Sequence, residues 1–403
     1  MKVLQINAVY EYSSTGRNVK ETHEFLQRSG IESYVAAPSL YGLRDNSYKI
    51  GSRAAMKIHG LLSRISGLQG YFSFLPTAGL IKYIKNIKPD IVHLHNVHGN
   101  YLNLGMLLKY LAKSDAAVVI TLHDTWFYTG KCCHYTEDGC YKWKECCGKC
   151  PAKKKYNKSW FFDFSGKMQR DKKSWFGSIK RLAVVGVSNW ISSEAKKSTV
   201  LRSAAIHETI YNWIDLSVFK PRDTKNLIKR LDIGNKYVIL GISQLWSVQK
   251  GLDIFIRLSE MLPDDCVIVM LGRADNVPDL NEKIKFAGTV NDTETLADYY
   301  SMADVFVNPS KQESFGKTTA EALACGTPAV GFNATATPEL IGFDGKCGAV
   351  VYEHTPEKYL EAILDIKKKT KAYFFENCRA KAESCFDKEK NLKKYTELYK
   401  KLL

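Results

Sequence analysis

The sequence has no apolar run long enough to cross a bilayer. Its longest apolar runs, such as Ala116–Leu122 and Leu182–Val187, fall far short of the about 20 residues that a membrane-spanning helix needs. The first residues include polar Gln5 and Asn7, so they lack the apolar centre of a secretory signal and fit a first β-strand instead. We therefore expect a cytoplasmic protein without a membrane-spanning helix.

Two common nucleotide-binding motifs are also missing. No Gly-x-Gly-x-x-Gly follows either opening strand, which excludes the usual nicotinamide fingerprint. Gly316-Lys-Thr looks like the end of a P-loop, but the first glycine of that motif would fall at Lys311. No internal repeat or low-complexity tract is present, and 45% hydrophobic with 25% charged residues is an ordinary globular composition. A disordered, collagen-like or fibrous chain is therefore excluded.

Acidic residues are in the minority. The 58 Lys and Arg residues exceed the 42 Asp and Glu residues by 16, which favours an anionic partner. A phosphate-bearing substrate, a nucleic acid and an acidic membrane surface all satisfy this condition. The length of 403 residues predicts two or three domains, since one domain takes about 150 residues.

Short apolar runs alternate with helical patterns along the whole chain. Such runs are typical of parallel strands that are buried on both faces, and helices between them indicate βαβ crossovers. Two series of strands in succession predict an α/β fold with two doubly wound parallel-sheet domains. The expected strands are Val3–Ala8, Ser33–Ala37, Ile91–His95, Ala117–Leu122, Leu182–Val187 and Ile206–Tyr211, then Tyr237–Ile242, Val267–Leu271, Ile284–Ala287, Val305–Asn308, Ala329–Phe332 and Ala349–Tyr352.

The boundary between the two series lies at Tyr211–Pro221, because Pro221 and the polar residues after it interrupt any strand or helix. We divide the chain into an N-terminal domain (1–214), a C-terminal domain (215–386) and a final helix (387–403). Residues Lys388–Leu403 place apolar side chains at helical spacing, so this helix needs a surface to cover.

The stretch Asn308–Gly331 carries the strongest functional signal. A strand ends in a polar loop, and Ser314-Phe-Gly316 leads into a helix whose first N–H groups are available to an anion. Glu313 and Glu321 bracket this turn, and a carboxylate accepts hydrogen bonds from hydroxyl groups. Phosphate binding beside hydroxyl binding is what a nucleotide sugar requires, whereas two arbitrary glutamates would more often be solvated charges.

Three segments together resemble glycosyltransferase family 4, a family of retaining enzymes with GT-B architecture. Glu313 and Glu321 match its Glu-x7-Glu motif, Asn212–Pro221 resembles its Asn-Gly-Ile-Asp hinge with Trp213 in place of Gly, and Gln249–Asp253 resembles its Lys-Gly element. The resemblance covers nearly the whole chain. It implies two Rossmann-like domains facing across a cleft, with the C-terminal helix crossing back to the first domain.

The resemblance also implies roles for individual residues. Lys250 would neutralise the donor diphosphate, Glu313 would bind sugar hydroxyls, and Glu321 would bind the ribose. An arginine that the family often places two residues into Gly241–Ser243 is absent. Further substrate contacts are assigned to Gly16 and Arg17 after the first strand and to Ser314, Phe315, Gly316, Lys317 and Thr318 around the helix start.

His123 stands at the end of the strand Ala117–Leu122 and is followed by Asp124. In family members with a similar pair, this histidine contacts the donor sugar, so we expect His123 to be catalytic together with Lys250 and Glu313. A histidine whose pKa is near neutral is able to donate to a sugar hydroxyl or to stabilise developing charge. His93, His95 and His98 lie in the segment Asp90–His98, which also resembles a strand of the family. We expect them to shape the acceptor pocket or to pack structurally, and not to bind a metal.

Six of the eleven cysteines lie between Cys132 and Cys150, a clustering that favours metal over disulfides in a cytosolic chain. Cys147-x2-Cys150 has zinc-knuckle spacing, and Cys132 and Cys140 complete four thiolates. The insertion 129–151 resembles one in a subgroup of bacterial exopolysaccharide and O-antigen transferases, which implies a structural Zn²⁺ on these four cysteines. Cys133 and Cys146 are then extra, His134 is an alternative ligand, and unliganded thiols are the alternative to zinc.

Pro151–Arg181 contains ten Lys and Arg residues and two Asp residues, so this segment carries half of the net charge of +16. Two tryptophans and four phenylalanines lie among these charges, including Trp160 and Phe161. This composition fits contact with anionic lipid headgroups. It fits a helix core with lysines in solvent equally well.

We therefore expect a retaining glycosyltransferase that moves a sugar from a UDP- or GDP-sugar to a lipid-linked saccharide in bacterial surface polysaccharide synthesis. It would be cytoplasmic and peripheral on the inner membrane face, with no catalytic metal and no nucleic-acid partner. The alternatives are a nucleotide-sugar epimerase of the same fold and a basic zinc-containing nucleic-acid-binding protein, which leaves Glu313 and Glu321 unexplained.

Overall fold

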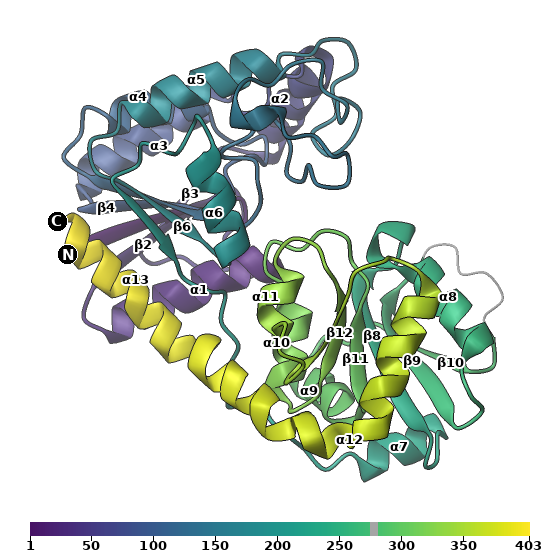
Figure 1. Cartoon of the computed structure of the whole chain (residues 1–403). Coiled ribbons are helices and arrows are strands. Elements are labelled where there is room, and N and C mark those ends of the chain that lie inside the picture. Colours follow the sequence, from purple (N-terminus) through teal and green to yellow (C-terminus); the bar gives the residue numbers. More distant parts are fainter. Residues whose placement is uncertain (275–280) are drawn as a thin grey trace. The chain divides into compact units, whose positions relative to one another are not determined.

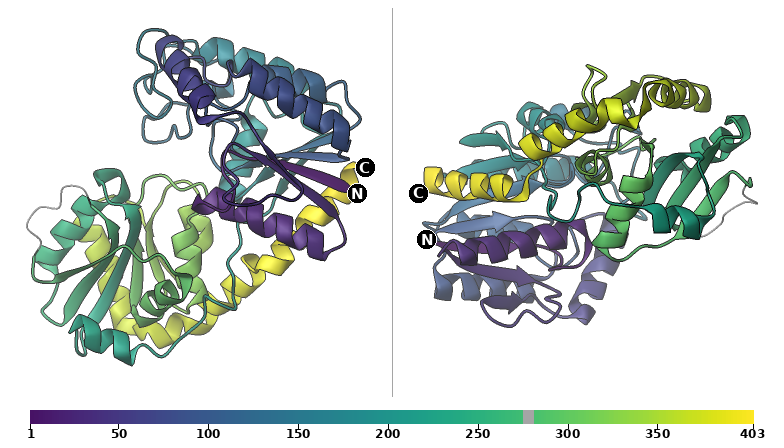
Figure 2. Two further views of the ribbon diagram at one scale, coloured as in Figure 1. Left: turned by 180° about the vertical axis from the view of Figure 1, so that it is seen from behind. Right: turned by 90° about the horizontal axis from the view of Figure 1, so that it is seen from below.

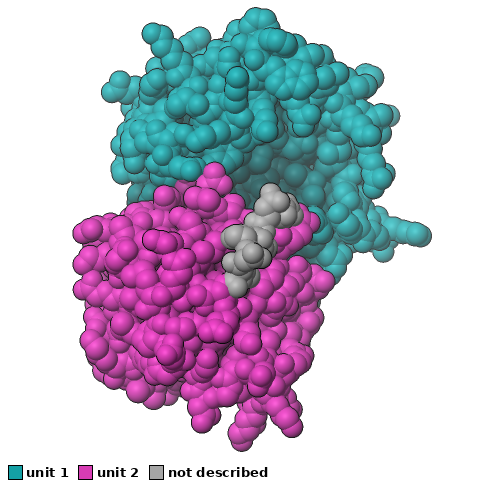
Figure 3. Space-filling model, turned by 90° about the vertical axis from the view of Figure 1, so that its right-hand side faces the viewer, with its two compact units in different colours: residues 1–210, 392–403 teal, residues 211–391 magenta. Residues whose placement is uncertain are grey.

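The computed structural model describes residues 1–274 and 281–403, which form two compact units (Figure 3). Unit 1 contains residues 1–210 and 392–403, and unit 2 contains residues 211–391. The boundary between the units follows residue 210, whereas the sequence analysis placed it after residue 214. Each unit is a parallel sheet with helices between its strands (Figure 1), so the predicted fold class of two Rossmann-like domains is confirmed.

Unit 1 is built on a seven-stranded sheet in the order β3-β2-β1-β4-β5-β6-β7. Its central strands are fully buried, because helices cover both faces of a doubly wound sheet. The strands are β1 (Lys2–Ile6), β2 (Glu32–Ala37), β3 (Ser47–Lys49), β4 (Ile91–Leu94), β5 (Ala117–Leu122), β6 (Leu182–Gly186) and β7 (Ile206–Thr209), and the helices are α1 (Ser13–Arg28), α2 (Arg53–Ser66), α3 (Phe74–Ile87), α4 (Leu104–Leu111), η1 (Lys142–Lys144), α5 (Ser165–Gly177) and α6 (Asn189–Lys197).

Unit 2 contains a six-stranded sheet in the order β10-β9-β8-β11-β12-β13. Its longest helix, α12, is interrupted at Thr370, where φ is +64°. The strands are β8 (Tyr237–Leu245), β9 (Cys266–Arg273), β10 (Ile284–Gly288), β11 (Val305–Asn308), β12 (Ala329–Phe332) and β13 (Gly348–Val351), and the helices are α7 (Lys225–Leu231), η2 (Val248–Lys250), α8 (Leu252–Met261), α9 (Thr293–Met302), α10 (Lys317–Ala324), α11 (Thr337–Ile341) and α12 (Pro356–Cys385).

All twelve expected strands are present, and one strand was missed. β3 has only three residues and none of them is buried, so it lacks the apolar pattern that reveals the other strands.

Several helices begin where a side chain caps the first turn, among them those that follow Ser52, Asn103, Ser188 and Asp292. Within the described residues, no helix combines the length and the apolar character needed to cross a bilayer.

The last helix, α13 (Lys388–Leu402), contributes its C-terminal part to unit 1. There it covers the sheet with the predicted apolar face, whose members Leu392, Tyr395, Leu398, Tyr399 and Leu402 are all buried. Tyr395 and Tyr399 form hydrogen bonds with Thr121 and His93 on the sheet. The N-terminus, which precedes β1, belongs to unit 1 as well, and the two chain termini lie near each other there (Figure 2).

Gly241 in β8 is a position where the packing requires glycine. A Cβ atom at residue 241 would lie 2.4 Å from Cζ of Phe255 in α8, so Gly241→Ala must displace that ring. We expect this substitution to lower the free energy of unfolding by about 1–3 kcal/mol. Urea denaturation followed by tryptophan fluorescence measures it, because Trp246 packs against Phe255.

The matched control is Gly177→Ala, since a Cβ atom at Gly177 meets nothing within 4 Å. Alanine favours helix, so this change should be neutral or stabilising by up to about 1 kcal/mol. Equal effects of the two substitutions would contradict the close contact between β8 and α8.

Candidate nucleotide-sugar site

The loop between β11 and α10 forms the centre of the candidate site in unit 2. Gly316 is the N-cap residue of α10, with φ of +94°. A Cβ atom there would come no closer than 3.6 Å to any neighbour, so glycine is required by the backbone conformation and not by space. The turn leaves the first N–H groups of α10, including those of Lys317 and Thr318, at the start of the helix where an anion binds.

Lys250 reaches this loop from the neighbouring strand. It ends η2, just after β8, and Gly251 follows with φ of +78°. A Cβ atom on Gly251 would lie 2.3 Å from Cγ of Pro309, so glycine lets the η2 turn pack directly on the end of β11. The ammonium of Lys250 lies 2.7 Å from Oε1 of Glu313 and 3.3 Å from Oγ of Ser310.

Ser314 and Phe315 differ in what they offer to a ligand. The Phe315 side chain is buried and packs against Tyr211 and Phe386 in the same unit, so only its backbone N–H is suited to ligand binding, as predicted. Oγ of Ser314 is buried and has no hydrogen-bond partner in the described structure. An unsatisfied buried hydroxyl costs free energy, and a bound ligand is one way to satisfy it.

Glu321 lies on α10 and is almost completely buried. Its Oε2 accepts a hydrogen bond of 2.9 Å from the hydroxyl of Tyr300, and burial with the neighbouring carboxylate raises the pKa of that hydroxyl. Tyr300 therefore fixes the orientation of the second glutamate of the Glu-x7-Glu motif. The assigned role of Glu321 in ribose binding remains a prediction.

Arg273 is a residue that the sequence analysis missed. It ends β9 and pairs in register with Leu245 at the end of β8. Leu245 lies two residues after Ser243, close to the position where the family often has an arginine. The carboxyl ends of parallel neighbours meet at one edge of the sheet. Only the strand order brings this cation to the edge, so no local sequence pattern indicates it.

In unit 1, Gly16 and Arg17 lie in a helix and not in the loop that the sequence analysis expected. The helix α1 begins already at Ser13, and the preceding loop turns sharply at Glu11 and Ser13, which have φ of 68° and 64°. A Cβ atom on Gly16 would lie 3.1 Å from the backbone nitrogen of Glu11. Gly16 therefore permits tight packing of this turn, while Arg17 is exposed.

His123 follows β5 and belongs to a row of three histidine rings. Its ring centroid lies 5.4 Å from that of His95, which lies 4.0 Å from that of His93. Burial lowers the pKa of His123 to about 4 and that of His95 well below its usual value. These rings are therefore neutral at pH 7, which differs from the near-neutral pKa that we expected for His123.

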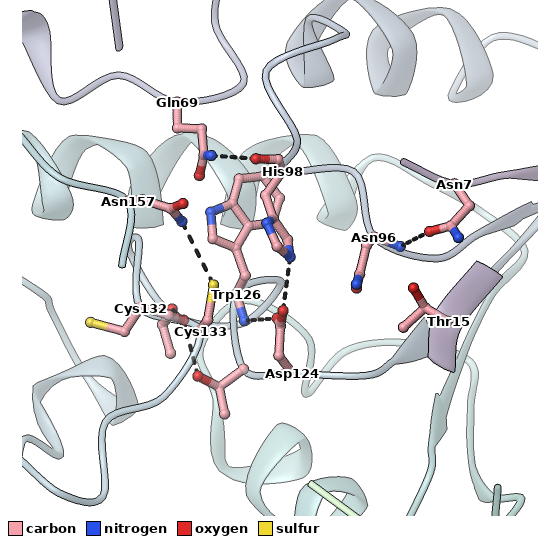
Figure 4. Close-up of polar contacts among 12 residues, drawn as sticks. Asn7, Thr15, Gln69, Asn96, His98, Asp124, Trp126, Cys132, Cys133 and Asn157 are labelled. Atoms are coloured by element: carbon pink, nitrogen blue, oxygen red, sulfur yellow. Dashed lines mark hydrogen bonds and ion pairs between the residues drawn. The ribbon is translucent and has the colours of Figure 1, made fainter. Parts of the chain in front are cut away.

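Asp124 does not pair with its neighbour His123. It accepts hydrogen bonds of 2.8 Å from Nε2 of His98 and from the backbone N–H of Trp126 (Figure 4). Burial alone would raise the pKa of Asp124, but His98 and the hydrogen bonds lower it to about 2. The sulfur of Cys133 joins this pair, so that three potential ligand atoms lie within 4.8 Å of one another.

Cys133 lies with His98 and Asp124 and does not line the cavity formed by Cys132, Cys140, Cys147 and Cys150, the four ligands to which the sequence analysis treated it as extra. Its side chain is half-buried, and Asn157 donates to its sulfur over 3.7 Å (Figure 4). The buried ammonium of Lys172 lies close enough to Cys133 and Asp124 to affect their charges.

The four cysteines that were predicted to bind zinc come together in unit 1. Cys132, Cys140, Cys147 and Cys150 line a single small cavity, to which Cys146 does not contribute. Cys132 donates a hydrogen bond to Cys150, which lowers the pKa of Cys150 to about 7, whereas burial raises that of Cys147 to about 11. The donor set of four sulfurs fits a soft metal ion such as zinc.

Unit 2 thus combines the groups that a charged, hydroxylated ligand needs. Lys250 supplies a cation, α10 supplies free N–H groups, and Glu313 supplies a carboxylate within reach of both. The catalytic and binding roles of the predicted residues remain predictions.

Two family models match the chain. The model described as Glycosyltransferase Family 4 matches residues 15–218, half of the chain, and the model described as Glycosyl transferases group 1 matches residues 236–369. Among individual proteins, a D-inositol 3-phosphate glycosyltransferase of Mycolicibacterium gilvum is 27% identical over 171 residues. This match covers 40% of the present chain but only 38% of that protein.

Solved structures match over the full length. The structure of Anabaena HepE in complex with UDP-glucose has a TM-score of 0.64 at 15% identity and covers 100% of both chains. WaaG, a glycosyltransferase involved in lipopolysaccharide biosynthesis, has a TM-score of 0.66 at 14% identity, covering 98% of this chain and 99% of WaaG. These similarities show the GT-B fold. With the family models, they show that the chain belongs to glycosyltransferase family 4.

Proposed function

We propose that the protein is a retaining glycosyltransferase that moves a sugar from a nucleotide diphosphate sugar to a saccharide acceptor. The observation that carries this proposal is the position of Lys250, 2.7 Å from Glu313 at the glycine-opened start of α10. An ammonium, unpaired helix N–H groups and a carboxylate are the partners of a diphosphate and a sugar.

The ion pair between Lys250 and Glu313 is suited to open on ligand binding. Its side chains are 41% and 21% exposed, so the pair is of modest strength. A diphosphate carries more charge than one carboxylate, so Lys250 exchanges its partner and Glu313 becomes free to accept from sugar hydroxyls. As the glycosyl bond breaks, negative charge grows on the leaving diphosphate, and preorganised donors around it lower the barrier.

The donor class is supported by the fold neighbour HepE, whose structure contains UDP-glucose. Participation in bacterial surface polysaccharide synthesis is supported by WaaG, which acts in lipopolysaccharide biosynthesis. We propose a lipid-linked saccharide as the acceptor. In unit 1, the family resemblance assigns His123 a contact with the transferred sugar.

Retention of the anomeric configuration is part of the proposal. The acceptor hydroxyl attacks from the face that the diphosphate leaves, and a phosphate oxygen takes the hydroxyl proton. This route needs no covalent intermediate on the protein and no catalytic metal, since Lys250 and the amides of α10 bear the charge.

A panel of UDP- and GDP-sugars, measured by isothermal titration, tests the donor site. We expect one member to bind, and Lys250→Ala to weaken it by about 10- to 100-fold, because a hydrogen bond to a charged group contributes about 1.5–3 kcal/mol. Glu313→Ala should lower turnover with acceptor by a similar factor. NMR of the product should show the anomeric configuration of the donor.

Lys346→Ala is the matched control, because Lys346 also pairs with a carboxylate in unit 2 but is 63% exposed. It should bind the donor as the wild type does. Unchanged binding by Lys250→Ala contradicts the proposal, and a new sugar isomer formed without any acceptor would identify an epimerase instead.

We further propose that Cys132, Cys140, Cys147 and Cys150 hold a structural Zn²⁺. Four thiolates would close the coordination of the ion, leaving no position for substrate. The part of unit 1 that contains them has little regular structure besides η1, so a metal would supply stability that few backbone hydrogen bonds provide.

Elemental analysis of the purified protein tests this site. We expect about one zinc per chain in the wild type and substantial loss of zinc from Cys147→Ser. Cys146→Ser is the matched control, since Cys146 is adjacent but exposed and does not line the cavity. Zinc retained by Cys147→Ser, or lost equally from both variants, contradicts the assignment.

Helix α2 supports the proposed membrane contact, in addition to the basic and aromatic segment Pro151–Arg181. Ile58, Leu61, Leu62 and Ile65 follow one another at helical spacing, and their exposed fractions run from 61% to 37%. The opposite face of α2 buries polar His59 and Ser63 instead. The helix therefore presents an apolar stripe to solvent, which is unusual for a globular protein.

Aromatic side chains continue this stripe. The backbone N–H of Trp160 donates to the carbonyl of Arg64 at the end of α2, and Trp160, Phe161, Phe162 and Phe164 are all exposed. The helix carries three basic and no acidic residues, and residues 151–162 carry four lysines and no acidic residue. We propose that this apolar and basic surface binds an anionic bilayer.

Co-sedimentation with vesicles that contain phosphatidylglycerol tests the surface. We expect binding that falls with added salt, and each of Leu61→Ser and Trp160→Ala to lower the partition coefficient by about tenfold, because burying one such side chain contributes roughly 1.5 kcal/mol. Phe343→Ser is the control, as Phe343 in unit 2 is 68% exposed. Equal binding to neutral vesicles, or no effect of the unit 1 variants, contradicts the proposal.

A further inference from the structure

A chain of hydrogen bonds crosses the carboxyl edge of the sheet in unit 1 and ends at His123. Gln5 belongs to β1, His95 follows β4, and His123 follows β5. These three strands are neighbours in the sheet, so their ends meet at one edge. Gln5 and His95 are buried, which shields their hydrogen bonds from exchange with water.

The direction of this chain is set by a backbone carbonyl. The oxygen of Val19 can only accept, and the amide Nε2 of Gln5 lies 3.3 Å from it. Oε1 of Gln5 therefore faces His95, whose Nε2 is 3.3 Å away. Because an amide oxygen has no hydrogen to donate, Nε2 of His95 must carry the hydrogen.

The same reasoning extends to His123. A neutral imidazole carries one hydrogen, so His95 has a bare Nδ1. This Nδ1 lies 3.1 Å from Nε2 of His123, and His123 must be the donor. With its hydrogen on Nε2, a neutral His123 has a bare Nδ1, for which the described residues provide no hydrogen-bond partner.

We propose that Gln5 and His95 are positioning residues that hold His123 in the Nε2–H tautomer, so that Nδ1 of His123 serves only as a hydrogen-bond acceptor for a ligand hydroxyl. His123 then accepts from a sugar hydroxyl and cannot donate a proton to the leaving diphosphate. The sequence analysis considered His123 as a hydrogen-bond donor to a sugar hydroxyl, whereas this tautomer makes Nδ1 an acceptor. The ligand part of the inference rests on the proposed function, whereas the tautomer does not.

NMR of the protein with ¹⁵N-labelled histidine tests the tautomer without any substrate. Long-range couplings between ring protons and ring nitrogens distinguish a protonated nitrogen from a bare one. At pH 7 we expect His95 and His123 each to show a single Nε2–H form. Hydrogen on Nδ1 of His123, or an average of two tautomers, overturns the proposal whether or not the protein transfers a sugar.

Two substitutions at His95 separate positioning from packing. His95→Asn keeps an oxygen that accepts from His123, so the Nε2–H signature should remain, whereas His95→Leu removes the acceptor and should give averaged tautomers. With the donor that the panel identifies, His95→Leu should lower kcat/KM by up to about tenfold, and His95→Asn should recover most of that loss. Equal spectra and equal kcat/KM for the two variants contradict the positioning role.

The wild-type spectrum decides the tautomer even where His95→Leu fails to fold. A correct tautomer together with no binding of any nucleotide sugar would reject the proposed function and leave the tautomer assignment standing. An incorrect tautomer with normal transfer would reject only the inference about His95 and Gln5.

Discussion

Both candidate sites depend on one constraint of parallel sheets, which is that the carboxyl ends of adjacent strands meet at a single edge. In unit 2 this edge brings Lys250, which follows β8, to Glu313, which follows β11. In unit 1 it brings His95 to His123. Residues far apart in the sequence thereby become neighbours, while the strands beneath them stay buried and mostly apolar. The edge is therefore the part of each unit where polar chemistry costs least.

Polar groups gathered at such an edge must satisfy one another when no ligand is bound, because an unpaired buried charge is unfavourable. Lys250 pairs with Glu313, and His98 pairs with Asp124. The two pairs differ in exposure, since the side chains of Lys250 and Glu313 are 41% and 21% exposed and those of His98 and Asp124 are 20% and 13% exposed. The more exposed pair is the one that a ligand displaces more easily, whereas the less exposed pair, also held by the N–H of Trp126, fixes the chain after β5.

The sequence predicted the architecture well because burial on both faces leaves near-continuous apolar runs, and only the short, exposed β3 lacked that signal. It predicted less of the side-chain environment. Glu11 and Ser13 adopt positive φ values, and α1 begins at Ser13, earlier than expected. A positive φ is suggested by the sequence only where the residue is glycine. An apolar spacing such as that of α2 is typical of a helix face that packs in the core, and only the tertiary structure shows that Ile58 and Leu61 face solvent. Polar partners such as His98 and Cys133 depend on how loops fold over the sheet, which local patterns do not encode.

The attachment of the cysteine-rich insertion illustrates how a single buried cation organises irregular chain. The ammonium of Lys172 on α5 donates to the carbonyls of Trp126, Thr129 and Gly130 and lies 3.5 Å from the ring centroid of Trp126. Burial lowers the pKa of Lys172 to about 7, yet three carbonyls and an aromatic face compensate the ammonium for its lost hydration. These contacts fix the first residues after Asp124 to α5, independently of any metal. The proposed zinc ion would thus organise only the part of the insertion beyond residue 131, whereas the protein's own hydrogen bonds hold Asp124 and the residues that follow it.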